Sequence, residues 1–155
     1  GQWKQIVQRW LEAIKFSGRF KARQIPRSQR SLSSLCNQRV VFVGRLSRTK
    51  GVHYLLKAMR IVHQELPKAV LVLLGEGHDS ESFVQLTDEL GLNDVVTFLG
   101  WADRETVQAE LARSTVVAFH SIYPEAFGIS GIEAMAHGKP VVGFDVGGGG
   151  RLVEA

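Results

Sequence analysis

The chain has 155 residues, of which 45% are hydrophobic and 22% are charged, a composition typical of one globular domain with a core. Its apolar runs are too short to cross a bilayer, its first residues carry no secretory signal pattern, and its one cysteine, Cys36, excludes an internal disulfide. Residues 1–39 hold nine basic residues and a single acid, Glu12, so the remainder is mildly acidic, which argues against nucleic acid as the main partner. We therefore expect a cytoplasmic domain that carries a basic arm.

Residues 1–38 are predicted to form that arm, with a helix followed by a linker. Residues 3–16 have the spacing of an amphipathic helix, whereas residues 17–38 show no period. The apolar face is made by Trp3, Ile6, Val7, Trp10, Leu11 and Ile14. Either this helix covers an exposed face of the domain, or the arm contacts the inner face of an anionic membrane through its cations and tryptophans. We favour the first, because two tryptophans left in water would promote aggregation.

From Arg39 onward, short apolar runs alternate with segments of helical spacing. The runs predict buried strands at residues 39–43, 69–74, 95–99, 115–120 and 140–144. The spacing predicts helices at residues 50–66, 81–90, 104–112 and 129–137. This alternation predicts an α/β fold, a Rossmann-like doubly wound parallel sheet, in a domain of residues 39–155. Ligands of such sheets bind beyond the carboxyl ends of the strands, so the loops at that edge are the candidate site.

The loop after the first predicted strand, residues 44–51, carries a glycine and two flanking cations. Gly44 permits a sharp turn, and Lys50 lies beside the start of a predicted helix, whose exposed N–H groups favour anions. Together with Arg45, these features predict a clamp for a diphosphate. A solvated basic turn is the alternative, and this loop alone does not decide between the two.

The loop after the second predicted strand contains Gly75 and Gly77 in a G-x-G pattern. A dinucleotide fingerprint needs a third glycine three residues further on, where this chain has Ser80. We therefore reject an NAD-binding site.

The segment of residues 121–142 is the most specific in the chain. Glu125 falls just before a predicted helix and Glu133 within it, and a carboxylate can accept hydrogen bonds from two vicinal sugar hydroxyls. The backbone N–H groups from Phe127 to Ile129 lie at the helix start and would face a phosphate. The alternative, that Glu133 is an ordinary surface residue, is weakened by core-type neighbours that would leave a glutamate in need of partners. These neighbours are Ile132, Ala134, Met135 and Ala136.

Five motifs between residues 40 and 148 resemble, in their order, the C-terminal domain of family 4 glycosyltransferases, which is one half of the GT-B fold. They are G-R-L-x-x-x-K-G at residues 44–51, L-x-G-x-G at 73–77, V-x-F-L-G at 96–100, E-x-F-G-I-x-x-x-E-A-M-A-x-G-x-P-V-V at 125–142, and the glycine pair at 147–148. The resemblance implies a retaining transferase that moves a hexose from a nucleoside-diphosphate sugar, with UDP-glucose favoured, to a polysaccharide or glycolipid.

The resemblance also implies roles for individual residues. Arg45 and Lys50 would contact the donor diphosphate and stabilise it as it leaves, Glu125 would lie beside the transferred sugar, and Glu133 would bind the ribose. The remaining contacts would come from the phosphate and sugar cradle of Phe127, Gly128 and Ile129, from the turn at Gly44, and from a border of the base formed by Gly75, Gly77, Leu99, Gly100 and Trp101. No metal and no other cofactor is implied, because fixed cations and a helix terminus supply the electrostatic stabilisation.

The sequence departs from the family pattern at two positions, and it covers only part of the length of the family's proteins. Arg151 replaces a glutamate that is usual after the glycine pair, and His120 replaces a common proline. The family's closing elements and its acceptor-binding N-terminal domain have no counterpart here, so we expect this chain by itself to bind donor without appreciable transfer.

The transferase has two alternatives. One is a non-catalytic nucleotide-sugar-binding or regulatory module, and the other is a related epimerase or phosphorylase. A module without turnover has no need of a clamp for the leaving group. The transferase is therefore favoured by the joint presence of Arg45, Lys50, Glu125 and Glu133.

Overall fold

Short runs of β-branched and aliphatic residues form the strands, and amphipathic segments between them form the helices. The computed structural model describes residues 7–8, 38–123 and 128–144. From Gln38 onward the elements are β1 (Arg39–Val43), the 3-10 helix η3 (Arg48–Lys50), α2 (Val52–Glu65), β2 (Val70–Leu74), α3 (Ser80–Glu89), β3 (Val96–Gly100), α4 (Arg104–Arg113), β4 (Val116–Phe119), α5 (Ile129–Ala136) and β5 (Val141–Gly143). Every predicted strand and helix of this part of the chain is present, with ends that differ by only a few residues.

One boundary differs in a way that matters for the site. The helix predicted to begin at Lys50 begins at Val52, and Lys50 ends the short helix η3 instead. Gly51 separates the two helices with a left-handed φ of 68°, and a Cβ at Gly51 would lie 2.0 Å from the carbonyl oxygen of His120. The chain thus turns directly against the end of β4 before α2 begins. The spacing of apolar residues in the sequence does not predict this contact.

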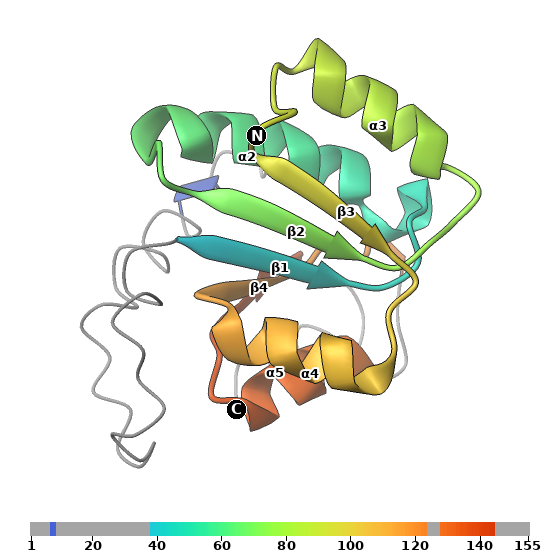
Figure 1. Cartoon of the computed structure of the whole chain (residues 1–155), viewed down its shortest axis with the longest axis vertical. Helices are drawn as coiled ribbons and strands as arrows, with labels where there is room; N and C mark the ends of the chain where they lie inside the picture. Colours follow the sequence, from blue (N-terminus) through green and yellow to red (C-terminus); the bar gives the residue numbers. More distant parts are fainter. Residues whose placement is uncertain (1–6, 9–37, 124–127, 145–155) are drawn as a thin grey trace.

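All five strands are parallel and lie in the order β3-β2-β1-β4-β5. Helices α2 and α3 cover one face of the sheet, and α4 and α5 lie on the other (Figure 1). The order reverses at β1, whose neighbours are β2 and β4. This is the doubly wound arrangement that was predicted, and a reversal of this kind opens a crevice at the carboxyl ends of the strands.

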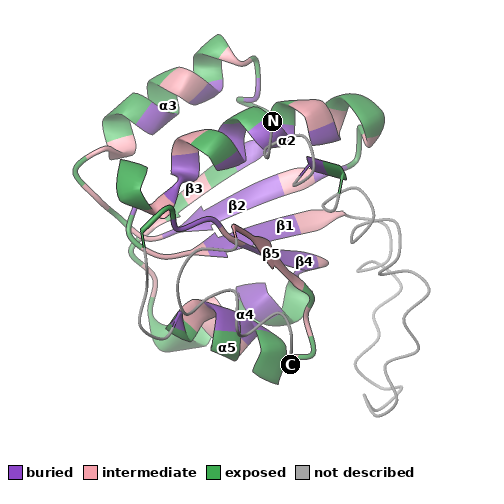
Figure 2. Cartoon of the chain, turned by 180° about the vertical axis from the view of Figure 1, so that it is seen from behind, coloured by how far each residue is buried: buried purple, intermediate pink, exposed green. Residues whose placement is uncertain are grey.

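Alternate residues of the strands enter two separate cores, one on each face of the sheet. The core on the α2 side contains Val40, Phe42, Leu71, Leu73, Val116 and Ala118, packed with Leu55, Leu56, Met59 and Val62 of α2. The core on the other side contains Val41, Val72, Leu74 and Val117, packed with Leu111 of α4 and Ala134 of α5. Figure 2 shows the same division, with buried residues on the strands and on the helix faces turned toward them. The continuous apolar runs of the central strands are explained by this burial on both faces.

The predicted arm is described at two residues, Val7 and Gln8. Both are helical; Val7 is buried in the core on the α2 side, and Gln8 is exposed. The other arm residues, including Cys36, lie outside the described residues, as do Glu125, Phe127, the glycine pair at 147–148 and Arg151. None of the helices in the described ranges combines the length and the apolar composition that crossing a bilayer requires.

Candidate active site at the carboxyl edge of the sheet

The loops that follow β1, β2 and β3 are joined to one another by backbone hydrogen bonds. The Gly44 N–H donates to the Leu74 carbonyl (2.9 Å), and the Leu46 N–H donates to the Glu76 carbonyl (3.0 Å). The Gly75 N–H donates to the Gly100 carbonyl (2.7 Å). The three loops therefore form one connected surface at the edge where parallel sheets bind ligands.

Gly75 and Gly77 are required by this close approach of two backbones. A Cβ at Gly75 would lie 2.0 Å from the Gly44 carbonyl oxygen, and a Cβ at Gly77 would lie 2.0 Å from the Leu46 carbonyl oxygen. Gly75 also has a φ of 129°, which side chains rarely adopt. The G-x-G pattern therefore positions the β1 loop against the β2 loop, a role that differs from the phosphate contact of a dinucleotide fingerprint.

The β1 loop carries the two cations predicted to clamp a diphosphate. Arg45 is exposed, and Lys50 is half-buried at the end of η3. The loop is ordered by its own hydrogen bonds, because the Ser47 N–H donates to the Arg45 carbonyl (3.0 Å) and the Lys50 N–H donates to the Ser47 carbonyl (3.1 Å). From outside the loop, a carboxylate oxygen of Asp79 accepts from the Arg48 N–H (2.9 Å). The backbone positions from which the two cations extend are therefore fixed.

Glu76 joins the two segments that were predicted to border a base. Its Oε1 accepts a hydrogen bond from the Trp101 N–H (3.3 Å), just beyond the end of β3. Trp101 itself is 74% exposed, and Leu99 is also exposed. An indole ring left in water at the edge of the sheet can stack on a planar ring. Glu76 was not singled out from the sequence, where it is only the variable residue of the G-x-G turn.

Helix α5 places the other predicted contacts at its start. Gly128 is its N-cap residue, with no side-chain cap, and Ile129 is the first helical residue and is exposed. The first amide groups of a helix have no acceptor within it, so this end of α5 can receive an anion.

Glu133 lies half-buried within α5. The prediction that its neighbours belong to the core is wrong in part. Of the core-type residues around it only Ala134 is buried, whereas Ile132, Met135 and Ala136 are exposed. The physical reason is that α5 packs on the sheet through the narrow face of Gly131 and Ala134, which turns the other apolar residues outward. Burial therefore gives Glu133 no need for a partner, and its role rests on the resemblance.

An aromatic cluster around the buried His120 lies beyond the ends of β4 and β5, and no motif of the sequence predicts it. The rings of His120 and Phe144 meet edge to face with centroids 5.3 Å apart, and Tyr54 meets Phe144 in the same way at 5.7 Å. Burial lowers the pKa of His120 from its ordinary 6.5 to about 3, so His120 is neutral at neutral pH. This fits a packing residue, as a lone histidine usually is.

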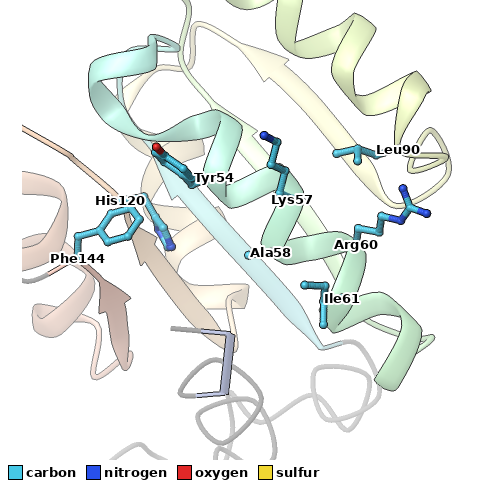
Figure 3. Close-up of a pocket in the computed structure, with 8 residues that line it drawn as sticks. All are labelled: Tyr54, Lys57, Ala58, Arg60, Ile61, Leu90, His120 and Phe144. Atoms are coloured by element: carbon cyan, nitrogen blue, oxygen red, sulfur yellow. The ribbon is translucent and has the colours of Figure 1, made fainter. Parts of the chain in front are cut away.

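A mostly apolar cavity of about 410 Å³ adjoins the cluster (Figure 3). In the described part of the chain it is lined by Tyr54, Lys57, Ala58, Arg60, Ile61, Leu90, His120 and Phe144. Most of these side chains come from α2, while Leu90 follows α3 and the pair His120 and Phe144 follows β4 and β5. No cluster of three or more His, Cys, Asp or Glu that could hold a metal ion occurs among the residues that the structure describes.

The sequence matches known proteins over most of its length. Residues 27–155 match the family model described as Glycosyl transferases group 1. An uncharacterized glycosyltransferase of Methanocaldococcus jannaschii is 40% identical over 109 residues, which cover 70% of this chain and 27% of that protein. A poly(glycerol-phosphate) alpha-glucosyltransferase of Bacillus subtilis is 31% identical over 113 residues, which cover 73% of this chain and 16% of that protein. The chain thus spans less than a third of the length of these relatives.

The fold matches solved structures as well. HepE of Anabaena, in complex with UDP-glucose, superposes with a TM-score of 0.69 and 35% sequence identity over 80% of this chain and 34% of that one. The strand order and the layers described above are therefore those of one half of a GT-B fold.

Proposed function

The chain belongs to the group 1 family of glycosyl transferases, and on this basis we propose that it is the donor-binding domain of a retaining hexosyltransferase. The donor is a nucleoside-diphosphate sugar, with UDP-glucose favoured, and the acceptor is a polysaccharide or glycolipid. The observation that carries the proposal is the connected surface formed by the β1, β2 and β3 loops. On that surface the cations of one loop lie in the same hydrogen-bonded unit as the exposed aromatic ring beyond β3.

Different loops of the site would bind different parts of the donor. Arg45 and Lys50 would hold the diphosphate and neutralise the charge that develops on it as the glycosidic bond breaks. The N–H groups at the start of α5 would support the same oxygens. Trp101, with Gly75, Gly77, Leu99 and Gly100, would border the base, while Glu125 and Glu133 would bind the sugar and the ribose. A second domain that binds the acceptor would complete the cleft.

Two features of the relatives support the finer parts of this proposal. HepE was crystallised with UDP-glucose, which favours a uracil base and a glucose. The Bacillus subtilis relative is an alpha-glucosyltransferase. Since the glucose of UDP-glucose is itself α-linked, an α-linked product corresponds to retention of configuration.

A non-catalytic nucleotide-sugar-binding module is the alternative. It would use the same loops, so the structure of the donor site does not separate the two functions. What favours the enzyme is the ordered pair of cations in the β1 loop, because binding without turnover does not require stabilisation of a leaving group. Slow hydrolysis of a bound donor would support the enzyme, since water can reach a site without an acceptor domain.

The experiment is a thermal-shift panel with UDP-, GDP- and ADP-sugars, each with and without EDTA. A ligand that binds only the folded chain stabilises it by about 2.7 kcal/mol at a hundredfold excess over its Kd. We expect one nucleotide, UDP, to raise Tm most, and we expect EDTA to leave that shift unchanged. Absence of a shift with every donor would refute the proposed function, and a shift lost in EDTA would refute the metal-free clamp.

A further inference from the structure

The short helix η3 is held by two loops that lie on opposite sides of the point where the strand order reverses. On the β2 side, the Arg48 N–H at the start of η3 donates to a carboxylate oxygen of Asp79 (2.9 Å). On the β4 side, the Ile122 N–H donates to the Thr49 carbonyl (2.9 Å). Lys50 is the last residue of η3. It therefore extends from a segment whose backbone is fixed from both sides.

Asp79 supplies the acceptor that the start of η3 lacks in its own sequence. The first amides of a helix have no acceptor within it. Ser47 is the N-cap residue of η3, but its side chain makes no cap bond, and its Oγ pairs with Thr49 Oγ1 (2.8 Å). Asp79 lies 31 residues further along the chain, at the start of α3. A hydrogen bond from an amide to a carboxylate is charge-assisted and thus stronger than one to a neutral oxygen.

The charge of Asp79 opposes what a diphosphate site needs. A carboxylate repels a bound diphosphate, and the Asp79 side chain is only 20% exposed, so water screens this repulsion in part. The exposed His78 lies beside it, with Nε2 3.2 Å from the carboxylate. An acid next to a loop of cations is therefore best explained by its contact with the backbone of η3.

We infer that Asp79 is a positioning residue of the donor site, which holds η3 so that Lys50 reaches the diphosphate. The inference rests on the proposed function, in which the β1 loop binds the diphosphate of the donor. Asp79 does not touch the donor in this account. It acts through the backbone of Arg48, two residues before Lys50. Binding of the nucleoside, which other residues would border, does not require it.

The test compares Asp79→Ala with Asp79→Asn by calorimetry, with UDP and uridine as probes. Both substitutions remove the charge, but only asparagine keeps an oxygen that can accept from the Arg48 N–H, and Asn and Asp are comparable as capping residues. We expect Asp79→Ala to weaken UDP binding roughly three- to tenfold, as loss of a cap does, and to leave uridine binding unchanged. Asp79→Asn should bind UDP at least as tightly as the unsubstituted chain, because the repulsive charge is gone.

Two results of this comparison would overturn the inference. Equal losses of UDP affinity in both variants would mean that the charge of Asp79 matters and its contact with η3 does not. Loss of uridine affinity together with UDP affinity would mean a general effect on the fold. Asp88→Ala is the matched control, because it removes an exposed carboxylate at the other end of α3, where Asp88 Oδ1 accepts from Asn93 Nδ2 (2.6 Å). It should leave both affinities unchanged.

Hydrogen exchange of the free protein provides a readout that needs no ligand. Amides within residues 48–51 should exchange faster in Asp79→Ala than in the unsubstituted chain, and Asp79→Asn should restore their protection. Unchanged exchange in Asp79→Ala would overturn the inference. If the unsubstituted chain bound no nucleoside diphosphate, the proposed function would fail, and this inference with it. If Asp79→Ala bound UDP as well as the unsubstituted chain does, only this inference would fail.

Discussion

The two ends of the carboxyl edge of the sheet both have close backbone contacts, but only one of them adds an aromatic cluster beside a cavity. On the β2 and β3 side, the loops are joined through their backbones, as in the bonds from Leu46 to Glu76 and from Gly75 to Gly100. On the β4 and β5 side, the Ile122 N–H donates to the Thr49 carbonyl (2.9 Å), and a Cβ at Gly51 would meet the carbonyl oxygen of His120. This side adds packing between aromatic side chains, with His120 and Phe144 in an edge-to-face pair beside a cavity.

This difference has consequences for what each side can do. Backbone contacts at this distance admit only glycine at fixed positions, so they fix the backbone from which the cations and the aromatic ring extend. Side-chain packing beside a cavity tolerates change, because neighbouring rings can shift into free space. A site that must pre-organise charges for a diphosphate is expected on the first side.

The largest effect is expected where the backbone contact is broken. Gly77→Ala places a Cβ 2.0 Å from the Leu46 carbonyl oxygen, and we expect it to lower the free energy of unfolding by about 3–5 kcal/mol. Gly91→Ala is the control, because Gly91 has a φ of 68° but no atom within 4 Å of the added Cβ. It should cost about 1 kcal/mol. Urea unfolding measures both, and equal losses would show that the two loops are not held by this contact.

The next effect concerns the cations that the rigid side presents. Arg45→Ala and Lys50→Ala should each weaken binding of a nucleoside diphosphate by about 1.5–3 kcal/mol, the range of a hydrogen bond to a charged group. Binding of the nucleoside without phosphates should hardly change. Arg48→Ala, which removes another exposed cation of the same loop, is the control and should leave both affinities nearly unchanged. Calorimetry that found equal losses for nucleoside and diphosphate would contradict the clamp.

The buried histidine of the aromatic side should make the stability of the fold depend on pH. Burial lowers the pKa of His120 to about 3, so between pH 6.5 and 3 the unfolded chain binds a proton there that the folded chain does not. Stability must therefore fall as the pH falls through this window, by about 1.4 kcal/mol per pH unit from this residue. His120→Phe removes the titrating group while keeping a ring beside Phe144. Urea unfolding at about pH 7 and pH 5 should show a smaller loss for the variant, and parallel losses would mean that His120 is not buried as described.

The smallest effect is expected at the exposed ring. Trp101→Ala should weaken binding of the nucleoside and of its diphosphate equally, by about 1 kcal/mol or somewhat more, as loss of base stacking does. Trp101→Phe keeps an aromatic face and should recover most of this loss. The pattern is the opposite of that for Lys50, where only the diphosphate is affected. If Trp101→Ala left nucleoside affinity unchanged in calorimetry, the base would have to lie elsewhere.

The sequence by itself determined the elements and the edge of the sheet that carries the candidate site. Strands and helices are set by local periodicity, and the alternation of the two restricts the fold to a parallel sheet with helices on both faces. Gly75 and Gly77 were visible as a motif because a close backbone contact leaves no other residue possible. Arg45 and Lys50 were visible because cations beside a helix start suit a phosphate.

Only the tertiary structure decided how residues distant in the chain meet. No local pattern predicts that Glu76 accepts a hydrogen bond from the Trp101 backbone, 25 residues away. The exposure of Met135 depends on which narrow face of α5 meets the sheet, since α5 is apolar on more than one side. The burial of Val7 in one cluster with residues of β1, β4 and α2 depends on contacts between segments that are far apart in the chain. Periodicity predicts that a helix has an apolar face, but which residues that face contacts is determined only when the helix packs on the sheet.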